Sequence, residues 1–167
     1  GGGRGGGGEG GRGAGDGVGG ARPGGVKAGP GCEGGEIRDS AEEAVAAKID
    51  GLIVGNTTLD RPSTLQSRHA QEGGGLSGLP LLPKADACLA KMYQFTGRRL
   101  PLIGCGGVAS GAHAYAKIRA GASLVQLYSA LVYHGPELII RIKRELAGRL
   151  RADGFKSVAE AVGADSQ

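Results

Sequence analysis

Apolar residues recur in two patterns along most of the chain, one typical of buried strands and one typical of amphipathic helices. Short apolar runs with β-branched members predict three strands, at residues 52–54, 100–105 and 123–128. Apolar positions three or four residues apart predict helices around these strands. The helices run from Ser40 to about Lys48, from Lys84 to Thr96, from Gly111 to Arg119, from Pro136 to about Ala152, and from Ser157 to about Val162.

Local signals mark the helix starts. The segments SAEE at 40–43 and SVAE at 157–160 have the spacing of a capping box, in which a serine hydroxyl and a glutamate carboxylate each satisfy a free backbone amide. Ser110 can cap the third helix, and Pro136 suits the first turn of the fourth. We therefore expect helices that begin at residues 40, 111, 136 and 157.

The order of elements predicts the fold class. Strands that alternate with helices at this spacing favour right-handed crossovers and a parallel sheet. Three parallel strands leave two unpaired edges, whereas natural parallel sheets are normally longer or closed. We therefore expect an α/β fold that is part of a TIM (β/α)8 barrel and comprises about its last three strand–helix units.

Glycine divides the chain into two parts. Twenty of the 36 glycines lie in residues 1–35, where the only apolar residues besides alanine are Val18, Val26 and Cys32. Such a tract cannot bury enough apolar surface to offset the entropy of ordering it. We therefore expect a disordered tract over residues 1–35 and a barrel domain over residues 36–167.

Composition excludes several classes of function. Residues 36–167 contain no apolar run long enough to span a bilayer. A net charge of +4 and 4% aromatic residues argue against a nucleic-acid-binding surface. Cys32, Cys88 and Cys105 are odd in number and lack metal-ligand spacing, so we interpret them as free thiols in a reducing compartment. No histidine has a partner at metal-ligand spacing, and we predict no metal site.

Candidate chemistry lies where the predicted strands end, since barrel active sites are built at the carboxyl ends of strands. Gly106 and Gly107 precede a serine-capped helix, so backbone amides there can approach an anion, helped by the helix dipole. Tyr128 and Ser129 follow the next strand and can complete a phosphate cradle. The alternative interpretation of the two glycines is a tight turn.

Polar residues after the first predicted strand suggest a second kind of contact. Asn56 and Thr57 offer an amide and a hydroxyl, which suit a flat ligand rich in carbonyl and N–H groups, or bond locally to the backbone. The segment GGLSG at 74–78 either approaches a ligand closely or acts as a hinge. Cys105 is interpreted as a small apolar filler rather than a nucleophile. We predict no catalytic residue in this chain.

Four segments in register carry a family resemblance. They are DGLIVGNTT at 50–58, GGLSG at 74–78, IGCGGV at 103–108 and AGASLVQLYSA at 120–130. Their order and spacing closely resemble the carboxyl-terminal part of the quinone-dependent (class 2) dihydroorotate dehydrogenases. The likeness runs from about Asp39 to Asp165.

The resemblance implies an enzyme that contains FMN, oxidises dihydroorotate to orotate in pyrimidine (UMP) biosynthesis, and passes the electrons to a membrane quinone. It further implies that Asn56 and Thr57 bind the orotate. The residues that it assigns to FMN are Gly55, Gly78, Gly107, Tyr128 and Ser129, the last three of them around the phosphate. At Gly55 the family usually has threonine or serine, so that here only a backbone contact remains.

Several functional groups of the family lie upstream of the matched region. They are the catalytic serine base, a lysine that contacts the flavin, several asparagine ligands, and the amino-terminal helices that dock on the membrane and admit quinone. The glycine tract stands in their place here. We therefore expect that this chain alone neither holds FMN stoichiometrically nor turns over dihydroorotate. The family is peripheral on the cytoplasmic face of the cell membrane, and without the docking helices we expect a cytoplasmic chain.

Two other interpretations stay open. The first is another FMN- or phosphate-binding barrel enzyme, against which the pair Asn56 and Thr57 and the segment LSG at 76–78 argue. The second is a non-catalytic fragment that is stabilised by a missing half or by self-association through its open strand edges.

Overall fold

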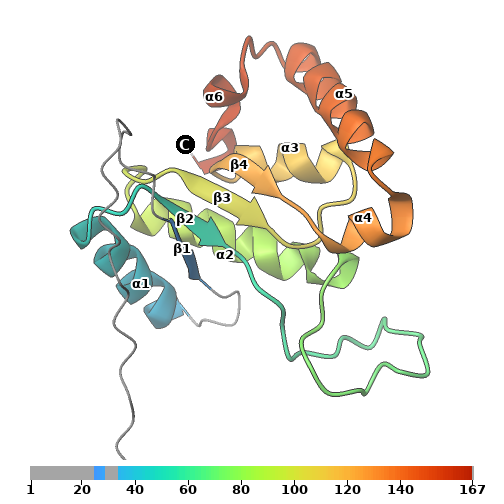
Figure 1. Ribbon diagram of the computed structural model, residues 1–167. Coiled ribbons are helices and arrows are strands. Elements are labelled where there is room, and N and C mark those ends of the chain that lie inside the picture. Colours follow the sequence, from blue (N-terminus) through green and yellow to red (C-terminus); the bar gives the residue numbers. More distant parts are fainter. Residues whose placement is uncertain (1–24, 29–33, 167) are drawn as a thin grey trace, which may run out of the picture.

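The computed structural model describes residues 25–28 and 34–166, and its centre is a parallel sheet with the strand order β1-β2-β3-β4 (Figure 1). The strands are β1 (Gly25–Ala28), β2 (Gly51–Val54), β3 (Leu102–Cys105) and β4 (Ala122–Gln126). The helices are α1 (Gly34–Ala46), α2 (Leu82–Phe95), α3 (Gly111–Arg119), α4 (Ser129–His134), α5 (Glu137–Ala152) and α6 (Val158–Ala161). Short 3-10 helices span Leu79–Leu81 and Ala164–Ser166. Parallel neighbours in sequence order confirm the predicted α/β fold and are consistent with part of a barrel.

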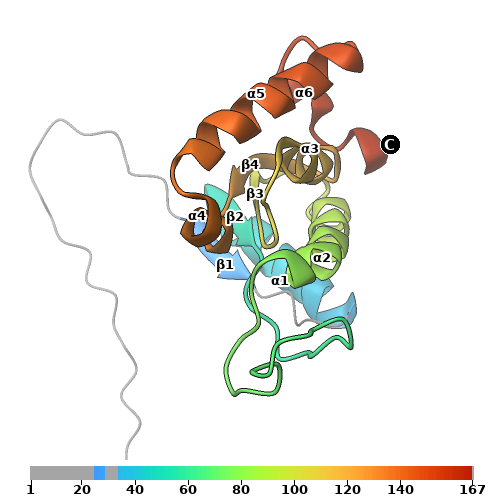
Figure 2. The same cartoon turned by 90° about the vertical axis from the view of Figure 1, so that its right-hand side faces the viewer.

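The two faces of the sheet differ in what covers them. The register aligns Lys27, Ile53, Ile103 and Leu124 in one row across the sheet, so their side chains share a face. Leu124 in this row is 64% exposed. The residues that alternate with this row in β2 and β3 point to the opposite face, where α1 and α2 cover them (Figure 2). The sheet is therefore buried on its helix side and open on the side that would face a barrel axis.

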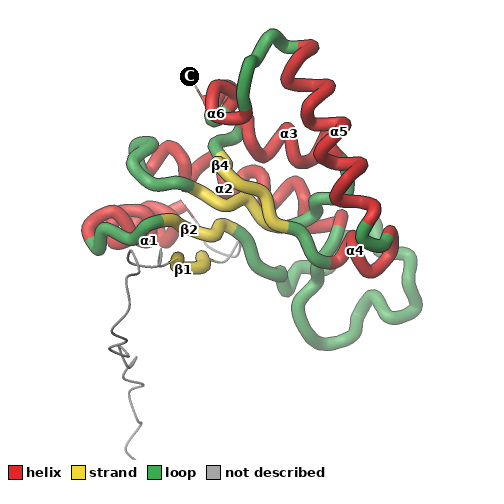
Figure 3. The backbone as a smooth tube through the Cα atoms, turned by 45° about the horizontal axis from the view of Figure 1, so that its top comes forward, coloured by secondary structure: helices red, strands yellow, loops and turns green. Residues whose placement is uncertain are grey.

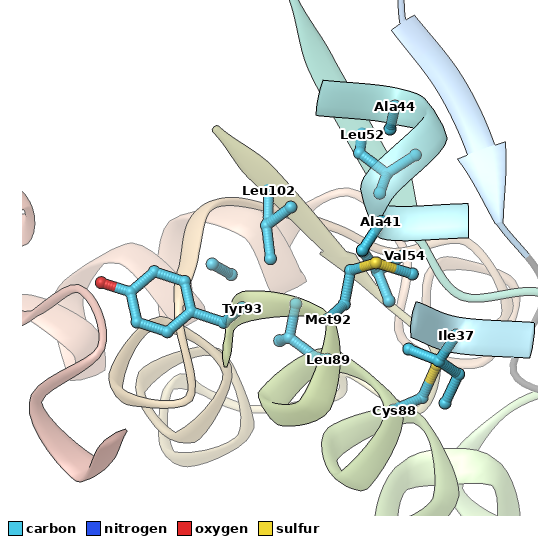
Figure 4. Packing of buried hydrophobic residues seen from close by; sticks show 11 residues of the cluster. Ile37, Ala41, Ala44, Leu52, Val54, Cys88, Leu89, Met92, Tyr93 and Leu102 are labelled. Atoms are coloured by element: carbon cyan, nitrogen blue, oxygen red, sulfur yellow. The ribbon is translucent and has the colours of Figure 1, made fainter. Parts of the chain in front are cut away.

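The main core lies between the sheet and the helices α1 and α2 (Figure 4). Figure 4 shows side chains from both helices meeting those of β2 and β3. The buried members of this cluster are Ile37, Ala41, Ala44, Leu52, Val54, Cys88, Leu89, Met92, Tyr93, Leu102 and Ala122. The predicted contact face of the second helix is confirmed, because Leu89 and Met92 are buried and Phe95 is partly buried.

Helix α3 packs against α5 at the β4 end of the sheet (Figure 3). Ala114 of α3 contacts a cluster that contains Leu138 and Ile142 of α5, as the spacing of apolar residues in the fourth predicted helix indicates. Ile139 lies outside this face and is 39% exposed. No helix within the described residues is long and apolar enough to cross a bilayer.

The predicted helix starts are confirmed at three of the four positions. The Ser110 hydroxyl accepts a hydrogen bond from the amide of His113, and the Ser157 hydroxyl accepts one from Glu160. Pro136 is the residue before the first turn of α5. The prediction of a cap at Ser40 is wrong, because α1 begins at Gly34 and places Ser40 in its interior. The helix extends towards the amino terminus because this buries Ile37 on the same face as Ala41 and Ala44.

The glycine tract contributes a strand that the hydrophobic pattern does not predict. β1 pairs with β2 in parallel, and the tract also supplies the first two residues of α1. A parallel ladder is made by backbone groups, so a short edge strand needs no apolar pattern of its own. The sheet therefore has four described strands rather than three. The rest of the tract, residues 1–24 and 29–33, lies outside the described residues, and the domain boundary after residue 35 stays a prediction.

Candidate functional site

A hollow of about 730 Å³ lies at the carboxyl ends of β2, β3 and β4. Four segments of the chain form its wall, namely residues 56–57, 76–81, 105–109 and 126–130, together with Lys27, Tyr133 and His134. This is the end of a parallel sheet at which barrel enzymes place their active sites. The three strand ends singled out in the sequence therefore meet at one cavity.

The structure brings together six of the seven residues that the sequence assigned to ligand binding. They are Asn56, Thr57, Gly78, Gly107, Tyr128 and Ser129, and all of them line the hollow. Their roles towards a ligand stay predictions.

Gly55 does not line this hollow, and its backbone instead lies against the end of β3. Its φ is 137°, and an added Cβ would lie 2.5 Å from the carbonyl oxygen of Cys105. Glycine is therefore required at position 55 by the close approach of two strand ends. A contact between Gly55 and FMN stays a prediction.

The side chains after β2 have partly local partners. The Oδ1 atom of Asn56 accepts a hydrogen bond from the backbone amide of Thr57 at 2.9 Å. The local bond between side chain and backbone that the sequence suggested is therefore present at this atom. Thr57 packs against the chain at Gly75, where an added Cβ would lie 2.0 Å from Oγ1 of Thr57. Both side chains are exposed, which leaves the side-chain nitrogen of Asn56, Nδ2, accessible from the hollow.

Gly78 and its neighbour Ser77 connect two walls of the hollow. The hydroxyls of Ser77 and Ser129 share a hydrogen bond of 3.0 Å between loop 76–81 and the start of α4. Gly78 has a φ of 80°, and the nearest atom to an added Cβ would be Cβ of Ser129 at 3.8 Å. A side chain at position 78 would therefore occupy space beside the hollow, and glycine leaves that space free for a ligand.

The glycines after β3 are required by packing. Gly106 and Gly107 have φ values of 102° and 75°. An added Cβ at Gly107 would lie 2.5 Å from Cβ of Leu82, the first residue of α2. Close packing against α2 and the positive φ therefore require glycine at position 107. The backbone of this loop still lines the hollow and can meet a ligand there.

The backbone amides at the start of α3 were expected to attract an anionic ligand, but two of them are bound by side chains of this chain. The amide of Gly111 donates to Oε2 of Glu145 at 2.7 Å, and the amide of His113 donates to the Ser110 hydroxyl. A carboxylate of the chain already satisfies this helix terminus. An anion in the hollow is therefore left with the loop after β3 and with Tyr128 and Ser129.

The charge of the hollow favours an anionic ligand. No aspartate or glutamate is among its described lining residues, and Lys27 of β1 supplies a cation. Lys27 is not predicted from the sequence, because it lies in the glycine tract. The adjacent Val26 was the available signal, since an apolar residue beside a lysine is compatible with an edge strand.

Cys105 also lines the hollow as a free, partly buried thiol. This position does not decide whether the residue is a small apolar filler, so that interpretation stays a prediction. The described residues contain no group of three or more metal-ligating side chains.

Comparisons with known proteins agree with the resemblance seen in the sequence. A family model described as dihydroorotate dehydrogenase matches residues 20–150, so the likeness begins inside the glycine tract rather than at residue 39. The chain is 58% identical over 140 residues to dihydroorotate dehydrogenase (quinone) of Xanthobacter autotrophicus, an alignment that covers 84% of this chain and 39% of that protein. It is 55% identical over 141 residues to the mitochondrial dihydroorotate dehydrogenase (quinone) of Oryza sativa, covering 84% and 30%.

A solved structure shows the same relation in three dimensions. Ligand-free DHODH from Eimeria tenella superposes with a TM-score of 0.83 and 41% sequence identity, covering 86% of this chain and 40% of that one. The chain thus spans well under half the length of the relatives it matches.

Proposed function

Since the chain belongs to the dihydroorotate dehydrogenase family, we propose that it is the carboxyl-terminal portion of a quinone-dependent enzyme of pyrimidine biosynthesis. The proposed reaction is the FMN-dependent oxidation of dihydroorotate to orotate, with quinone as electron acceptor and a peripheral location at a membrane. The observation that carries the proposal is the convergence of Asn56, Thr57, Gly78, Tyr128 and Ser129 on one hollow at the carboxyl ends of the strands.

The residues of the hollow fit FMN. A bound FMN supplies the acceptor for two electrons from dihydroorotate. Gly78 leaves room for close approach of a flat ring, because an added Cβ would meet no atom nearer than 3.8 Å. We assign the phosphate to the loop at Gly107 and to Tyr128 and Ser129, where backbone amides and a hydroxyl can donate. The absence of carboxylates from the described wall favours a dianionic group there.

Lys27 supports the same assignment. The resemblance implies a lysine that contacts the flavin and lies upstream of residues 39–165. We propose that Lys27 takes this role, because it lines the hollow from β1 and stands in register with Ile53 on the open face of the sheet. Its ammonium group would stabilise negative charge on a bound ligand.

We assign the substrate to Asn56 and Thr57. Their amide and hydroxyl both donate and accept hydrogen bonds, as recognition of orotate carbonyl and N–H groups requires. The ionisable groups among the described lining residues are those of Lys27, Cys105, Tyr128, Tyr133 and His134, and no carboxylate is among them. We therefore maintain that this chain binds ligands but does not supply the catalytic base.

Flavin titration tests the proposal. We expect the purified chain to lack a stoichiometric flavin band, to form no orotate from dihydroorotate, and to quench the fluorescence of added FMN with saturation. Lys27→Gln should weaken this binding about tenfold, whereas Lys91→Gln, on the exposed side of α2, should not. Equal affinity of the two variants would contradict the role of Lys27. Orotate formation by the chain alone would contradict its expected inactivity.

We also propose that the chain self-associates through its strand edges. Within the described residues β1 and β4 are the two edges of the sheet, and Leu124 on the open face is 64% exposed. Unpaired strand edges and exposed apolar surface both favour association. Light scattering should show a mass above that of the monomer that falls on dilution, and a stable monomer at high concentration would refute this.

A further inference from the structure

The chain between β2 and α2 forms a long excursion whose two ends lie side by side (Figure 1). We call residues 56–58 and 76–78 the neck of this loop. Thr58 and Leu76 form an isolated antiparallel bridge, in which each amide donates to the carbonyl of the other residue at 3.1 and 2.7 Å. The neck is important because it carries Asn56 and Thr57 on one side and Ser77 and Gly78 on the other.

Arg61 holds the two sides of this excursion together. Its Nη2 atom donates to the carbonyls of Glu72 and Gly74 at 2.8 and 2.6 Å. Its Nη1 atom lies 3.1 to 3.4 Å from the carbonyls of Thr58, Leu59 and Asp60. One guanidinium thus contacts the outgoing and the returning chain at the same time.

A second cation fixes the same region to α2. The ammonium of Lys84 pairs with the carboxylate of Asp60 and lies 3.4 Å from Oγ1 of Thr58. On the other side of the neck, the hydroxyl of Ser77 shares its hydrogen bond with Ser129. The neck is therefore attached to α2 through Lys84 and to the start of α4 through Ser77.

The contacts of Arg61 lie outside the packed core. Arg61 belongs to none of the buried clusters of the core, and all its described hydrogen bonds go to carbonyls of the loop. Its contacts join residues 58–60 of the outgoing chain to residues 72 and 74 of the returning chain, directly beside the neck. Asn56 and Thr57 lie at the end of the first of these segments, and Ser77 and Gly78 at the end of the second, where they line the hollow.

We propose that Arg61 is a positioning residue that holds the neck closed, so that the residues assigned to substrate and flavin face the same hollow. This inference rests on the proposed function for the identity of the ligands. Arginine suits the task because a planar guanidinium donates in several fixed directions, whereas a lysine ammonium is a single point on a flexible stem. A lysine at position 61 would keep the charge and lose the simultaneous contacts.

The test compares Arg61→Gln and Arg61→Lys with the wild-type chain, and uses Arg68→Gln as a matched control. Arg68 lies in the same loop, and its described hydrogen bond goes to its neighbour His69. In ¹⁵N-labelled chains, both Arg61 variants should speed amide hydrogen exchange at Leu76 about tenfold or more. They should also lower the order parameters of the neck amides, whereas Arg68→Gln should change neither quantity.

Three results would overturn the proposal. The first is unchanged exchange and order at the neck in Arg61→Gln. The second is full recovery of wild-type behaviour in Arg61→Lys, which would mean that charge alone suffices. The third is an equal increase of exchange at Leu52 and Leu102 in the core, which would mean that Arg61 acts on global stability.

An orotate titration separates this inference from the proposed function. We expect the amide signals of Asn56 and Thr57 to shift with orotate, and the affinity to fall about tenfold in Arg61→Gln. If the wild-type chain shows no shifts, the substrate assignment fails, while the exchange data still decide whether Arg61 holds the neck. If the neck opens and the affinity stays unchanged, the neck does not position the ligand contacts and the proposal is wrong.

Discussion

Replacing Asp86 with asparagine tests the buried ion pair that joins α2 to α3 behind the site. Lys117 of α3 is 0% exposed, and its Nζ atom donates to Oδ1 of Asp86 at 2.6 Å. The lysine stem lies against β3, because an added Cβ at Gly104 would lie 3.1 Å from its Cδ atom. The pair therefore supports the strand that ends at the hollow.

The magnitude follows from the burial of the two partners. Asparagine still accepts a hydrogen bond, but it leaves the ammonium without a counter-charge. Breaking a buried pair costs about 3–5 kcal/mol. Because the Asp86 side chain is 29% exposed, water replaces part of the lost interaction, and we expect a loss of about 2–3 kcal/mol in the free energy of unfolding. For a chain of this size, that loss lowers Tm by roughly 4–12 °C.

Urea unfolding followed by circular dichroism measures this loss, and Lys117→Met provides the comparison. Methionine fills similar space without a charge, and the remaining Asp86 carboxylate can turn to solvent. We expect Lys117→Met to lose less than half as much stability as Asp86→Asn. Wild-type stability of Asp86→Asn would refute the reasoning. Equal losses in the two variants would also refute it, since packing of the lysine stem would then outweigh the charge.

Three further predictions concern the frame around the site. Gly121→Ala should lower the free energy of unfolding by roughly 2–4 kcal/mol in urea, because an added Cβ would lie 2.2 Å from Cγ of Tyr93. Glu145→Ala should lower it by about 1 kcal/mol, because an amide of the first turn of α3 loses its acceptor. Lys84 holds the pKa of Asp60 below its ordinary value of 3.8. Wild type should therefore exceed Asp60→Asn in urea midpoint at neutral pH, and this difference should disappear as the pH falls below 3.8 through the lowered pKa.

The ends of helices were predictable from sequence where the signal is local. Ser110 and Ser157 cap their helices through an amide three residues away, a contact that short-range geometry determines. Ser40 has the same local signal, yet α1 continues past it to bury Ile37. Burial of an isoleucine against the sheet outweighs one capping hydrogen bond, and only the packed structure shows that this burial is available.

Strand β1 and its Lys27 were hidden from sequence analysis for a related reason. Parallel pairing joins Gly25–Ala28 to Gly51–Val54 across a connection that contains α1. The stabilising groups belong to the backbone, so the glycine-rich composition gave no sign of them.

By itself the sequence determined the α/β class, most helix ends, and the polar and glycine residues that follow three strands, because these features depend on neighbours a few residues apart. The tertiary structure decided which of these residues meet. Tertiary packing places the backbone of Gly55 against Cys105, pairs the first amide of α3 with Glu145, and joins the two sides of the long loop through Arg61. Each of these contacts depends on the close approach of segments far apart in the chain. Such an approach is fixed by packing, which no local pattern encodes.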